Sequence, residues 1–153
     1  MDAAFSVREA AREPLTVQAL MRMSEEWAAE NSCRGYRANT PADIDGNRVF
    51  LAESAGAAIG YLFGHAESAK RASSIMDEGT RVFEVEEIYV KPEWRSKGVG
   101  RALYDLAESA AKEEGVRYVT LSTATKDWKR IFHFYLDELG MEFWNARLFK
   151  SLE

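Results

Sequence analysis

The sequence is short of the residues that disulfides and Cys/His metal sites require. Its 153 residues include one cysteine, Cys33, and two histidines, His65 and His133. A single cysteine excludes an internal disulfide, and so small a set excludes a Cys/His zinc site. No apolar run approaches the roughly 18–20 residues of a membrane-spanning helix. Residues 1–10 carry acidic side chains and lack the apolar core of a secretion signal. We therefore expect a cytoplasmic protein with neither a metal site nor a membrane partner.

Positive charge is also in short supply. The 20 Lys and Arg residues are outnumbered by 25 Asp and Glu, which gives a formal net charge of −5. Proteins that coat phosphate backbones are normally basic, so nucleic acid is not an expected partner. The chain has no internal repeat and no low-complexity tract. Its length is typical of a single domain, and we expect one domain over residues 1–153.

Hydrophobic periodicity and turn residues predict a mixed α/β order. We expect strands near Phe5 and over residues 49–54, 57–65, 81–91, 116–123 and 141–150. We expect helices over residues 14–30, 99–115 and 128–139, and a loop over 31–47 with at most one short helix. The late strand–helix–strand unit should form a parallel pair, whereas the earlier hairpins pair antiparallel. The prediction is a twisted mixed sheet of about six to seven strands with helices on both faces.

One short segment is basic and rich in glycine within this acidic chain. Residues 88–103 read IYVKPEWRSKGVGRAL, so a strand ends near Val90 and a helix begins near Val99. Unpaired N–H groups at a helix start attract anions, and Gly98 and Gly100 would let a phosphate approach the backbone. Three cations fall in this segment: Arg95, Lys97 and Arg101. Dinucleotide and nucleoside-triphosphate loops require further residues that are absent here. The segment indicates a phosphate or pyrophosphate ligand; the alternative is a basic turn with packing glycines.

Two motifs connect this segment to a known family. RSKGVGRA at residues 95–102 matches the pattern Arg/Gln-x-x-Gly-x-Gly/Ala, and the strand before it also fits. Phe134-Tyr135 followed by Leu139-Gly140-Met141 is similar to a last-helix signature of the same proteins. With these motifs the chain resembles the GNAT superfamily of acetyl-CoA-dependent N-acetyltransferases over nearly its whole length. The resemblance implies a GNAT-like fold and transfer of an acetyl group from acetyl-CoA to a primary amine.

The sequence departs from the family pattern at the last helix. Three residues separate Tyr135 from Leu139 instead of the usual two. We therefore expect an extra residue or a bulge near the end of this helix. Trp128 stands where many members have an asparagine, so a cofactor contact from that position is not expected.

The resemblance also implies where the cofactor binds. The backbone of residues 96–101 would hold the CoA pyrophosphate, and the backbone of residues 88–90 would pair with the pantetheine arm where two parallel strands splay apart. The N–H of Val90 would polarise the thioester carbonyl. The implied cofactor-binding residues are Ile88, Tyr89, Val90, Arg95, Ser96, Lys97, Gly98, Val99, Gly100 and Arg101.

Glu86, Glu87 and Tyr135 are the implied catalytic residues. The chemistry is direct attack by a neutral amine, and an alkylammonium with a pKa near 10.4 must first lose a proton. Strict alternation along a strand places Glu86 and Glu87 on opposite faces. We favour Glu86 as the base because it shares its face with Ile88 and matches the family position; the alternative is that both are solvated or ion-paired. Tyr135 would assist the leaving thiolate, or else pack in the apolar stripe of the last helix.

The sequence leaves the acceptor open. In this family the acceptor is usually chosen by loops that correspond here to residues 27–47 and 67–80, and neither is dominated by one charge. A small-molecule amine, an amino acid, a polyamine and a protein N-terminus all remain candidates. One rival function is a catalytically inactive acyl-CoA-binding or regulatory domain of the same fold; another is an aromatic interaction module. The expected strand over 141–150 could support a homodimer through its exposed edge.

Overall fold

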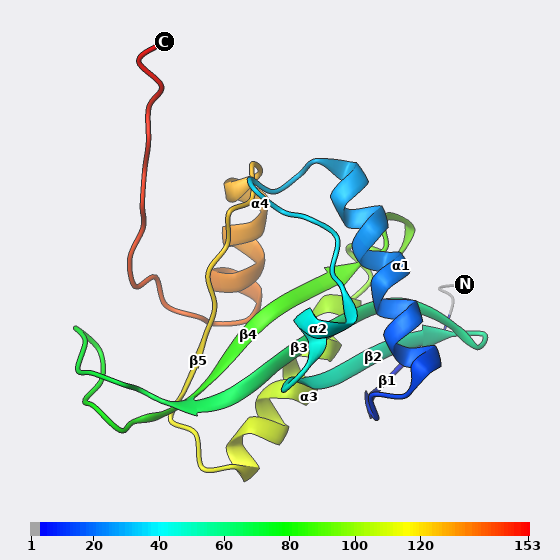
Figure 1. Cartoon of the computed structure of the whole chain (residues 1–153), viewed down its shortest axis with the longest axis horizontal. Coiled ribbons are helices and arrows are strands. Elements are labelled where there is room, and N and C mark those ends of the chain that lie inside the picture. The colour runs from blue at the N-terminus through cyan, green and yellow to red at the C-terminus, as the bar shows by residue number, and fades with distance from the viewer. Residues whose placement is uncertain (1–3) are drawn as a thin grey trace.

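A five-stranded sheet forms the centre of this computed structural model, which describes residues 4–153 (Figure 1). Its strands, in spatial as well as sequence order, are β1 (Ser6–Ala10), β2 (Arg48–Ser54), β3 (Ala57–Ser68), β4 (Arg81–Val90) and β5 (Tyr118–Thr120). Neighbours from β1 to β4 pair antiparallel, and β4 pairs with β5 in parallel. The mixed α/β sheet is confirmed, with five strands instead of six to seven. The single domain over 1–153 stays a prediction, and residues 1–3 lie outside the described residues.

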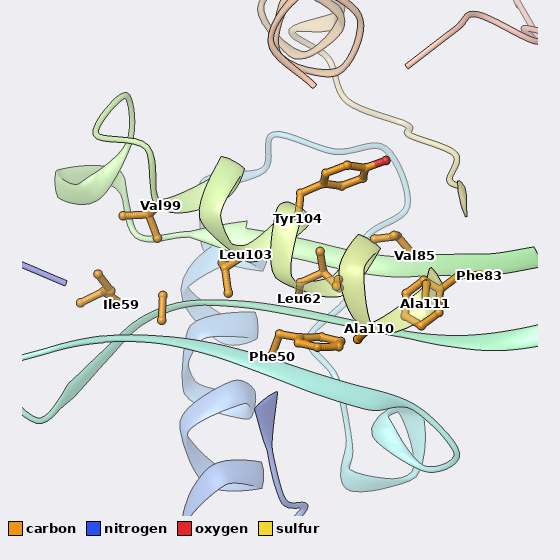
Figure 2. Packing of buried hydrophobic residues seen from close by; sticks show 12 residues of the cluster. Phe50, Ile59, Leu62, Phe83, Val85, Val99, Leu103, Tyr104, Ala110 and Ala111 are labelled. Carbon is orange, nitrogen blue, oxygen red and sulfur yellow. The ribbon is translucent and has the colours of Figure 1, made fainter. Parts of the chain in front are cut away.

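The two long helices cover opposite faces of the sheet. They are α1 (Pro14–Glu30), which begins with a proline in its first turn, and α3 (Val99–Glu113). On the α3 face, Leu103 and Ala107 pack against Phe50, Leu62 and Phe83 (Figure 2). On the α1 face, a second cluster contains Leu20, Met23, Tyr61, Phe63 and Tyr89. The prediction of helices on both faces is therefore confirmed.

A β-bulge interrupts the pairing of β3 with β4. Phe63 pairs with Glu87 and Gly64 pairs with Val85, which leaves Glu86 as the extra residue. A Cβ on Gly64 would meet the carbonyl oxygen of Glu84, so only glycine allows this close approach. Before the bulge odd-numbered residues of β4 face α3, whereas after it even-numbered residues do. The bulge therefore reverses the alternation of side chains along β4.

Short helices complete the fold. α2 (Pro41–Ile44) lies in the first loop, a 3₁₀ turn (Pro92–Trp94) follows β4, and α4 (Trp128–Phe132) continues into a π-helix (His133–Glu138). In the π-helix the N–H of Leu139 donates to the carbonyl of Phe134, five residues earlier, over 3.0 Å. Such a turn contains one residue more than an α-helical turn. The predicted extra residue near the end of the last helix is confirmed.

Three expectations about the C-terminal third are wrong. The strand expected over 116–123 is reduced to β5, because pairing with β4 ends at Glu84 and Thr120. The strand expected over 141–150 is absent: after Gly140 the chain is extended without a partner strand and rises past α4 (red in Figure 1). The apolar stripe of the last helix is not a core stripe, since Trp128 is 55% exposed and no residue of α4 is buried. In each case the local pattern predicts an element that also needs a neighbouring strand or core, and that neighbour is missing.

None of the helices within residues 4–153 combines the length and the apolar character that crossing a membrane requires.

Candidate active site

A cavity of about 720 Å³ opens where β4 and β5 part. The two strands pair only at residues 82–84 and 118–120, and beyond that point residues 85–90 and 121–125 form facing walls. The remaining walls come from the end of α1 with its following loop, the start of α3, and the α4–π-helix unit. This volume is typical of small-molecule sites. Because β4 has no partner on this side, its backbone can pair with an extended ligand.

The start of α3 presents unpaired backbone N–H groups to this cavity. Ser96 and Gly98 both have left-handed backbones, with φ of 60° and 84°. The first helical hydrogen bond is donated by the N–H of Ala102 to the carbonyl of Gly98, so the N–H groups of the first turn have no helical acceptor. Ser96, Gly98, Gly100 and Arg101 line the cavity. Unpaired N–H groups with a nearby cation fit a pyrophosphate.

The two glycines of this segment do different things. At Gly98 a Cβ would meet nothing within 4 Å, but the positive φ favours glycine. At Gly100 a Cβ would lie 3.1 Å from the ring of Phe134 in the π-helix. Gly98 therefore sets the turn, whereas Gly100 lets the last helix approach α3.

Eight of the ten predicted cofactor residues line the cavity: Ile88, Tyr89, Val90, Arg95, Ser96, Gly98, Gly100 and Arg101. Two are not part of the lining. The side chain of Val99 is buried in the α3 core, and the ammonium of Lys97 lies 5.5 Å from the centre of the Trp94 ring. Val99 is thus a core residue, and only its backbone, in the first turn of α3, could contact a cofactor.

Arg95 links the end of β4 to the end of α1 through hydrogen bonds. Its Nε donates to the carbonyl of Val90 over 2.9 Å, and its terminal nitrogen donates to Glu30 over 2.7 Å. The hydroxyl of Tyr89 also donates to Glu30, and burial raises the pKa of Tyr89. The guanidinium is therefore engaged within the protein. Of the three cations predicted to meet phosphate, Arg101 is the one that lines the cavity without a buried partner, its contact to Asp105 being exposed at 3.7 Å.

Glu86 occupies the bulge and lines the cavity. Its side chain is 45% exposed, and one carboxylate oxygen lies 3.7 Å from Nδ1 of His65. His65 follows Tyr61 and Phe63 in alternation along β3, so this contact places Glu86 on the α1 face of the sheet. Glu87 bonds Tyr61 on the same face. The prediction that the two glutamates lie on opposite faces is wrong, because the bulge breaks the alternation.

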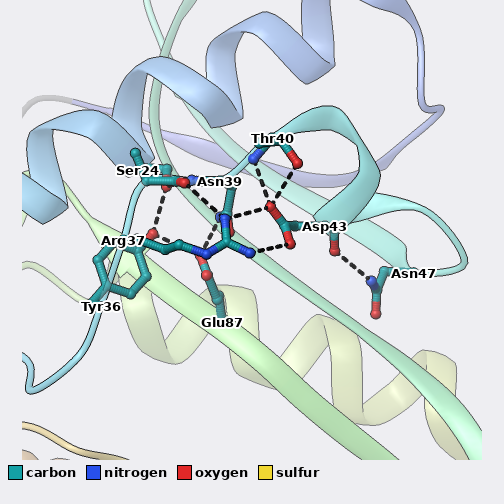
Figure 3. Close-up of polar contacts among 9 residues, drawn as sticks. Ser24, Tyr36, Arg37, Asn39, Thr40, Asp43, Asn47 and Glu87 are labelled. Carbon is teal, nitrogen blue, oxygen red and sulfur yellow. Dashed lines mark hydrogen bonds and ion pairs between the residues drawn. The ribbon is translucent and has the colours of Figure 1, made fainter.

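Glu87 is the centre of a partly buried hydrogen-bond network (Figure 3). Its carboxylate accepts from the hydroxyl of Tyr61 at 2.7 Å, the amide of Asn39 at 2.8 Å and the hydroxyl of Tyr36 at 3.2 Å. Burial raises the pKa of Glu87 above its ordinary value and that of Tyr36 to about 12. Ser24 of α1 joins the network, accepting from the backbone N–H of Asn39 at 2.7 Å. The network holds the loop after α1 against the sheet.

Tyr135 reaches the cavity from the π-helix. Burial raises the pKa of its phenol to about 12. Within residues 4–153 no buried side-chain polar atom lacks a hydrogen-bond partner, and this hydroxyl makes no hydrogen bond to the protein, so it is open to the cavity. The side chain thus lines the cavity instead of completing a core stripe.

Several cavity residues had no signal in the sequence. Glu30 meets Arg95 from 65 positions away, and nothing local marks that pair. Asp127 lines the cavity, whereas its neighbour Trp128 does not line it. Of the two loops expected to choose the acceptor, the first lines the cavity, whereas residues 67–80 border a separate hollow near Trp144. Across residues 4–153, no three His, Cys, Asp or Glu side chains gather as a metal site would require.

The comparisons with known proteins agree with this geometry. A bisubstrate complex of AAC(6')-Iy, with a CoA analogue of acetylneamine, has a TM-score of 0.71 at 18% identity over 99% of both chains. A mutant of the BH1408 protein from Bacillus halodurans has a TM-score of 0.75 at 19% identity, over 97% of this chain and 99% of that one. A soil-metagenome aminoglycoside acetyltransferase bound to sisomicin has a TM-score of 0.70 at 15% identity over 97% of both.

At these identities the solved structures show a shared fold. A search of curated proteins found no match. The profile of the acetyltransferase (GNAT) family matches residues 36–141, which include β4, the α3 segment and the last helix. The chain therefore belongs to the GNAT family of acetyl-CoA-dependent acetyltransferases.

Proposed function

We propose that this enzyme transfers the acetyl group of acetyl-CoA to a small-molecule primary amine by direct attack in a ternary complex. The observation that carries the proposal is one cavity that contains both the anion-binding start of α3 and the carboxylates of Glu86 and Glu87. The proposed cofactor site and the proposed base therefore share one cavity. A thioester and an amine can meet there without a covalent enzyme intermediate.

Acetyl-CoA supplies an activated acyl group as a thioester. The free N–H groups at the start of α3, with Arg101 beside them, would bind its pyrophosphate. The edge of β4 at residues 88–90, which has no partner strand, would bind the pantetheine arm as an added strand. The N–H of Val90 would polarise the thioester carbonyl, an interaction that is worth about 2.7–4 kcal/mol in other acyl-transfer enzymes.

Glu86 is the proposed base, and Glu87 is a positioning residue. Glu86 is partly exposed within the cavity, and its contact to His65 at 3.7 Å leaves it free to accept a proton. Glu87 already accepts three hydrogen bonds at 2.7–3.2 Å, which leaves it little capacity for a substrate amine. Glu86 would take the proton that the amine loses as the N–C bond forms.

Tyr135 would donate a hydrogen bond to the sulfur as the C–S bond breaks. Its pKa of about 12 keeps the phenol protonated throughout the physiological range. Full proton transfer to a thiolate would be uphill, since an ordinary thiol has a pKa near 8.5. The role proposed for Tyr135 is therefore stabilisation of the thiolate, which takes its proton from solvent after departure.

Two observations support a small cationic acceptor. The loop after α1, which lines the cavity, places Tyr36 beside Trp27 with ring centres 4.3 Å apart, next to Glu86 and Glu87. Aromatic faces and carboxylates together favour ammonium groups. Two of the structural relatives were crystallised with sisomicin or an acetylneamine analogue. A peptide amine remains the second candidate.

The test is a thiol-release assay with acetyl-CoA against a panel of aminoglycosides, polyamines, amino acids and peptides. We expect turnover with small amines that carry several ammonium groups. Turnover with peptides alone would contradict the proposed acceptor class. Acetyl-CoA binding without thiol release across the whole panel would instead support an acyl-CoA-binding domain.

A further inference from the structure

His65 of β3 lies between two glutamates that line different hollows. Glu86 lines the cavity between β4 and β5, whereas Glu67 lines the separate hollow near Trp144. Nδ1 of His65 is 3.7 Å from a carboxylate oxygen of Glu86, and Nε2 is 3.4 Å from one of Glu67. His65 itself is not part of the cavity lining. The imidazole therefore contacts the proposed base at a position where it touches no substrate.

The ring of His65 is oriented by Asn47. The amide nitrogen of Asn47 donates to the backbone carbonyls of Asp43 and Ile44, both over 3.3 Å (Figure 3). The amide oxygen is thereby turned toward His65 and lies 3.0 Å from Nδ1. Because an amide oxygen can only accept a hydrogen bond, Nδ1 carries a hydrogen. This hydrogen lies on the side of the ring that Glu86 approaches, since Glu86 also contacts Nδ1.

Both ring nitrogens of His65 face oxygen acceptors. Nδ1 faces Asn47 and Glu86, and Nε2 faces the carboxylate of Glu67. A neutral imidazole donates from one nitrogen only, whereas an imidazolium donates from both. The imidazolium is therefore the form that satisfies all of these contacts. A histidine ordinarily becomes charged below about pH 6.5, before a glutamate is protonated at about pH 4.3.

Further carboxylates near Glu86 oppose its ionised form. Glu84 of β4 pairs with His65 across the sheet, and Thr120 of β5 donates to its carboxylate. Burial raises the pKa of Glu84, and the charges of Glu86 and Glu67 raise it as well, whereas the bond from Thr120 and the charge of His65 lower it. Like charges raise the pKa of a carboxyl group, and a nearby cation lowers it. Among these three glutamates and one histidine, His65 is the side chain that favours an ionised base.

We propose that His65 is a positioning residue that holds the carboxylate of Glu86 in place and keeps it ionised as the pH falls below neutrality. The inference rests on the proposed function, in which Glu86 is the base. His65 acts on the reaction through Glu86, and Asn47 and Glu67 in turn hold the imidazole. The enzyme should therefore remain active at a lower pH than the same site would allow without the imidazole.

The first test compares the acidic limb of the pH profile of kcat in two variants. His65→Gln removes the charge, whereas His65→Lys keeps a positive charge. We expect the acidic limb of His65→Gln to move to higher pH by about 0.5–1 unit, which is the effect of a unit charge about 4 Å away in an aqueous dielectric. Its kcat at alkaline pH should change little, and the limb of His65→Lys should stay near that of the unmodified chain. An unmoved limb in His65→Gln, or an equal shift in both variants, would overturn the inference.

The second test requires no turnover. NMR titration of the imidazole protons follows His65 in the full chain, and His133, which contacts Asp137 on the π-helix, is the internal reference. Glu86→Gln should lower the titration midpoint of His65 by a similar amount, because the carboxylate stabilises the imidazolium and coupling between two sites is reciprocal. The midpoint of His133 should not change.

An unchanged His65 midpoint in Glu86→Gln would refute the coupling of the two side chains. The two proposals can also fail separately. If the midpoint moves as expected and no amine in the panel is acetylated, the proposed function is wrong, whereas the coupling of His65 to Glu86 is supported. If amines are acetylated and the midpoint does not move, the proposed function stands and the role of His65 is wrong.

Discussion

At the scale of single residues, two adjacent glutamates have different environments because one of them lies in a bulge. Glu86 is exposed beside His65, whereas Glu87 is half-buried and accepts three hydrogen bonds. The sequence favoured Glu86 as the base but placed the two glutamates on opposite faces, since alternation assigns faces correctly only in an uninterrupted strand. The contacts of Glu30, Asn39 and Tyr61 were not predicted, because each joins residues that are distant in sequence.

Replacing Glu86 tests the assignment of the base. We expect Glu86→Gln to lower kcat at neutral pH about 10²-fold or more, because an isosteric amide cannot accept the proton of the amine. The dissociation constant for acetyl-CoA should change little, since the cofactor is bound by the start of α3. Steady-state kinetics and equilibrium titration measure the two quantities.

Glu87→Gln is the matched comparison for that experiment. It keeps the size of the side chain and disturbs the network of Tyr36 and Asn39, so we expect its main effect on KM for the amine. Unchanged turnover in Glu86→Gln, with a large loss of kcat in Glu87→Gln, would reverse the two roles.

At the scale of elements, the sequence predicted what local pattern determines. The helices α1 and α3 and the β2–β3 hairpin follow from spacing, proline and glycine, and the extra residue in the last helix follows from comparison with the family signature. The elements that it missed depend on partners. Residues 141–150 have strand-forming side chains, but a strand also requires a neighbour. The apolar stripe from Trp128 to Leu139 has an α-helical period, whereas the π-helix gives those residues another rotation.

The turn before α3 can be tested at Gly98. We expect Gly98→Ala to weaken acetyl-CoA binding at least about tenfold, because a left-handed alanine costs about 1–2 kcal/mol and the turn would relax to avoid that cost. Gly56→Ala is the control: Gly56 has a similar φ of 77° against 84° for Gly98 and open space around its Cβ, but lies in the β2–β3 hairpin. Equal binding by the two variants would contradict the anion site at α3.

The start of α2 should give stability that depends on pH. The carboxylate of Asp43 accepts from the backbone N–H of Thr40 at 2.7 Å and lies near Arg37, and these contacts lower the pKa of Asp43 to about 2. The unfolded chain binds the proton first, so the contribution is complete above the ordinary value near 3.9 and is lost as the pH falls toward 2. Asp43→Asn should therefore lower the thermal midpoint at pH 7 and have little effect near pH 2.

The control for this pH series is Asp77→Asn, since no hydrogen bond or ion pair involves the Asp77 carboxylate within residues 4–153. Its thermal midpoint should match that of the unmodified chain at each pH. A difference between Asp43→Asn and the unmodified chain that persists at pH 2 would contradict the assignment.

At the scale of the whole molecule, the net charge of −5 excludes a polymer ligand more readily than a small one. The chain is acidic overall, yet the start of α3 presents unpaired N–H groups and Arg101 to one cavity. The net charge of the chain therefore bears on polymeric ligands, whereas the local geometry at the start of α3 bears on a small phosphate-containing ligand. The acidic net charge and the basic segment at the start of α3 could both be read from the sequence. The position of the cavity between β4 and β5 could be seen only in the fold.

Binding of acetyl-CoA should stabilise the molecule as a whole. A ligand that binds only the native state adds about 2.7 kcal/mol at one hundred times its dissociation constant. Differential scanning fluorimetry should show a rise in the thermal midpoint of several degrees. Adenosine lacks the pyrophosphate and should give little shift. An equal shift with adenosine would mean that the start of α3 does not bind phosphate.

The bulge at Glu86 divides β4 into two parts whose side chains pack against α3 independently of the residue at position 86. Phe83 and Val85 face α3 on one side of it, and Ile88 and Val90 face α3 on the other despite their opposite parity. Both hydrophobic registers are therefore satisfied whichever side chain occupies the inserted position. Position 86 can therefore be changed without repacking the core, so the loss of activity expected for Glu86→Gln should not be accompanied by a loss of folding stability.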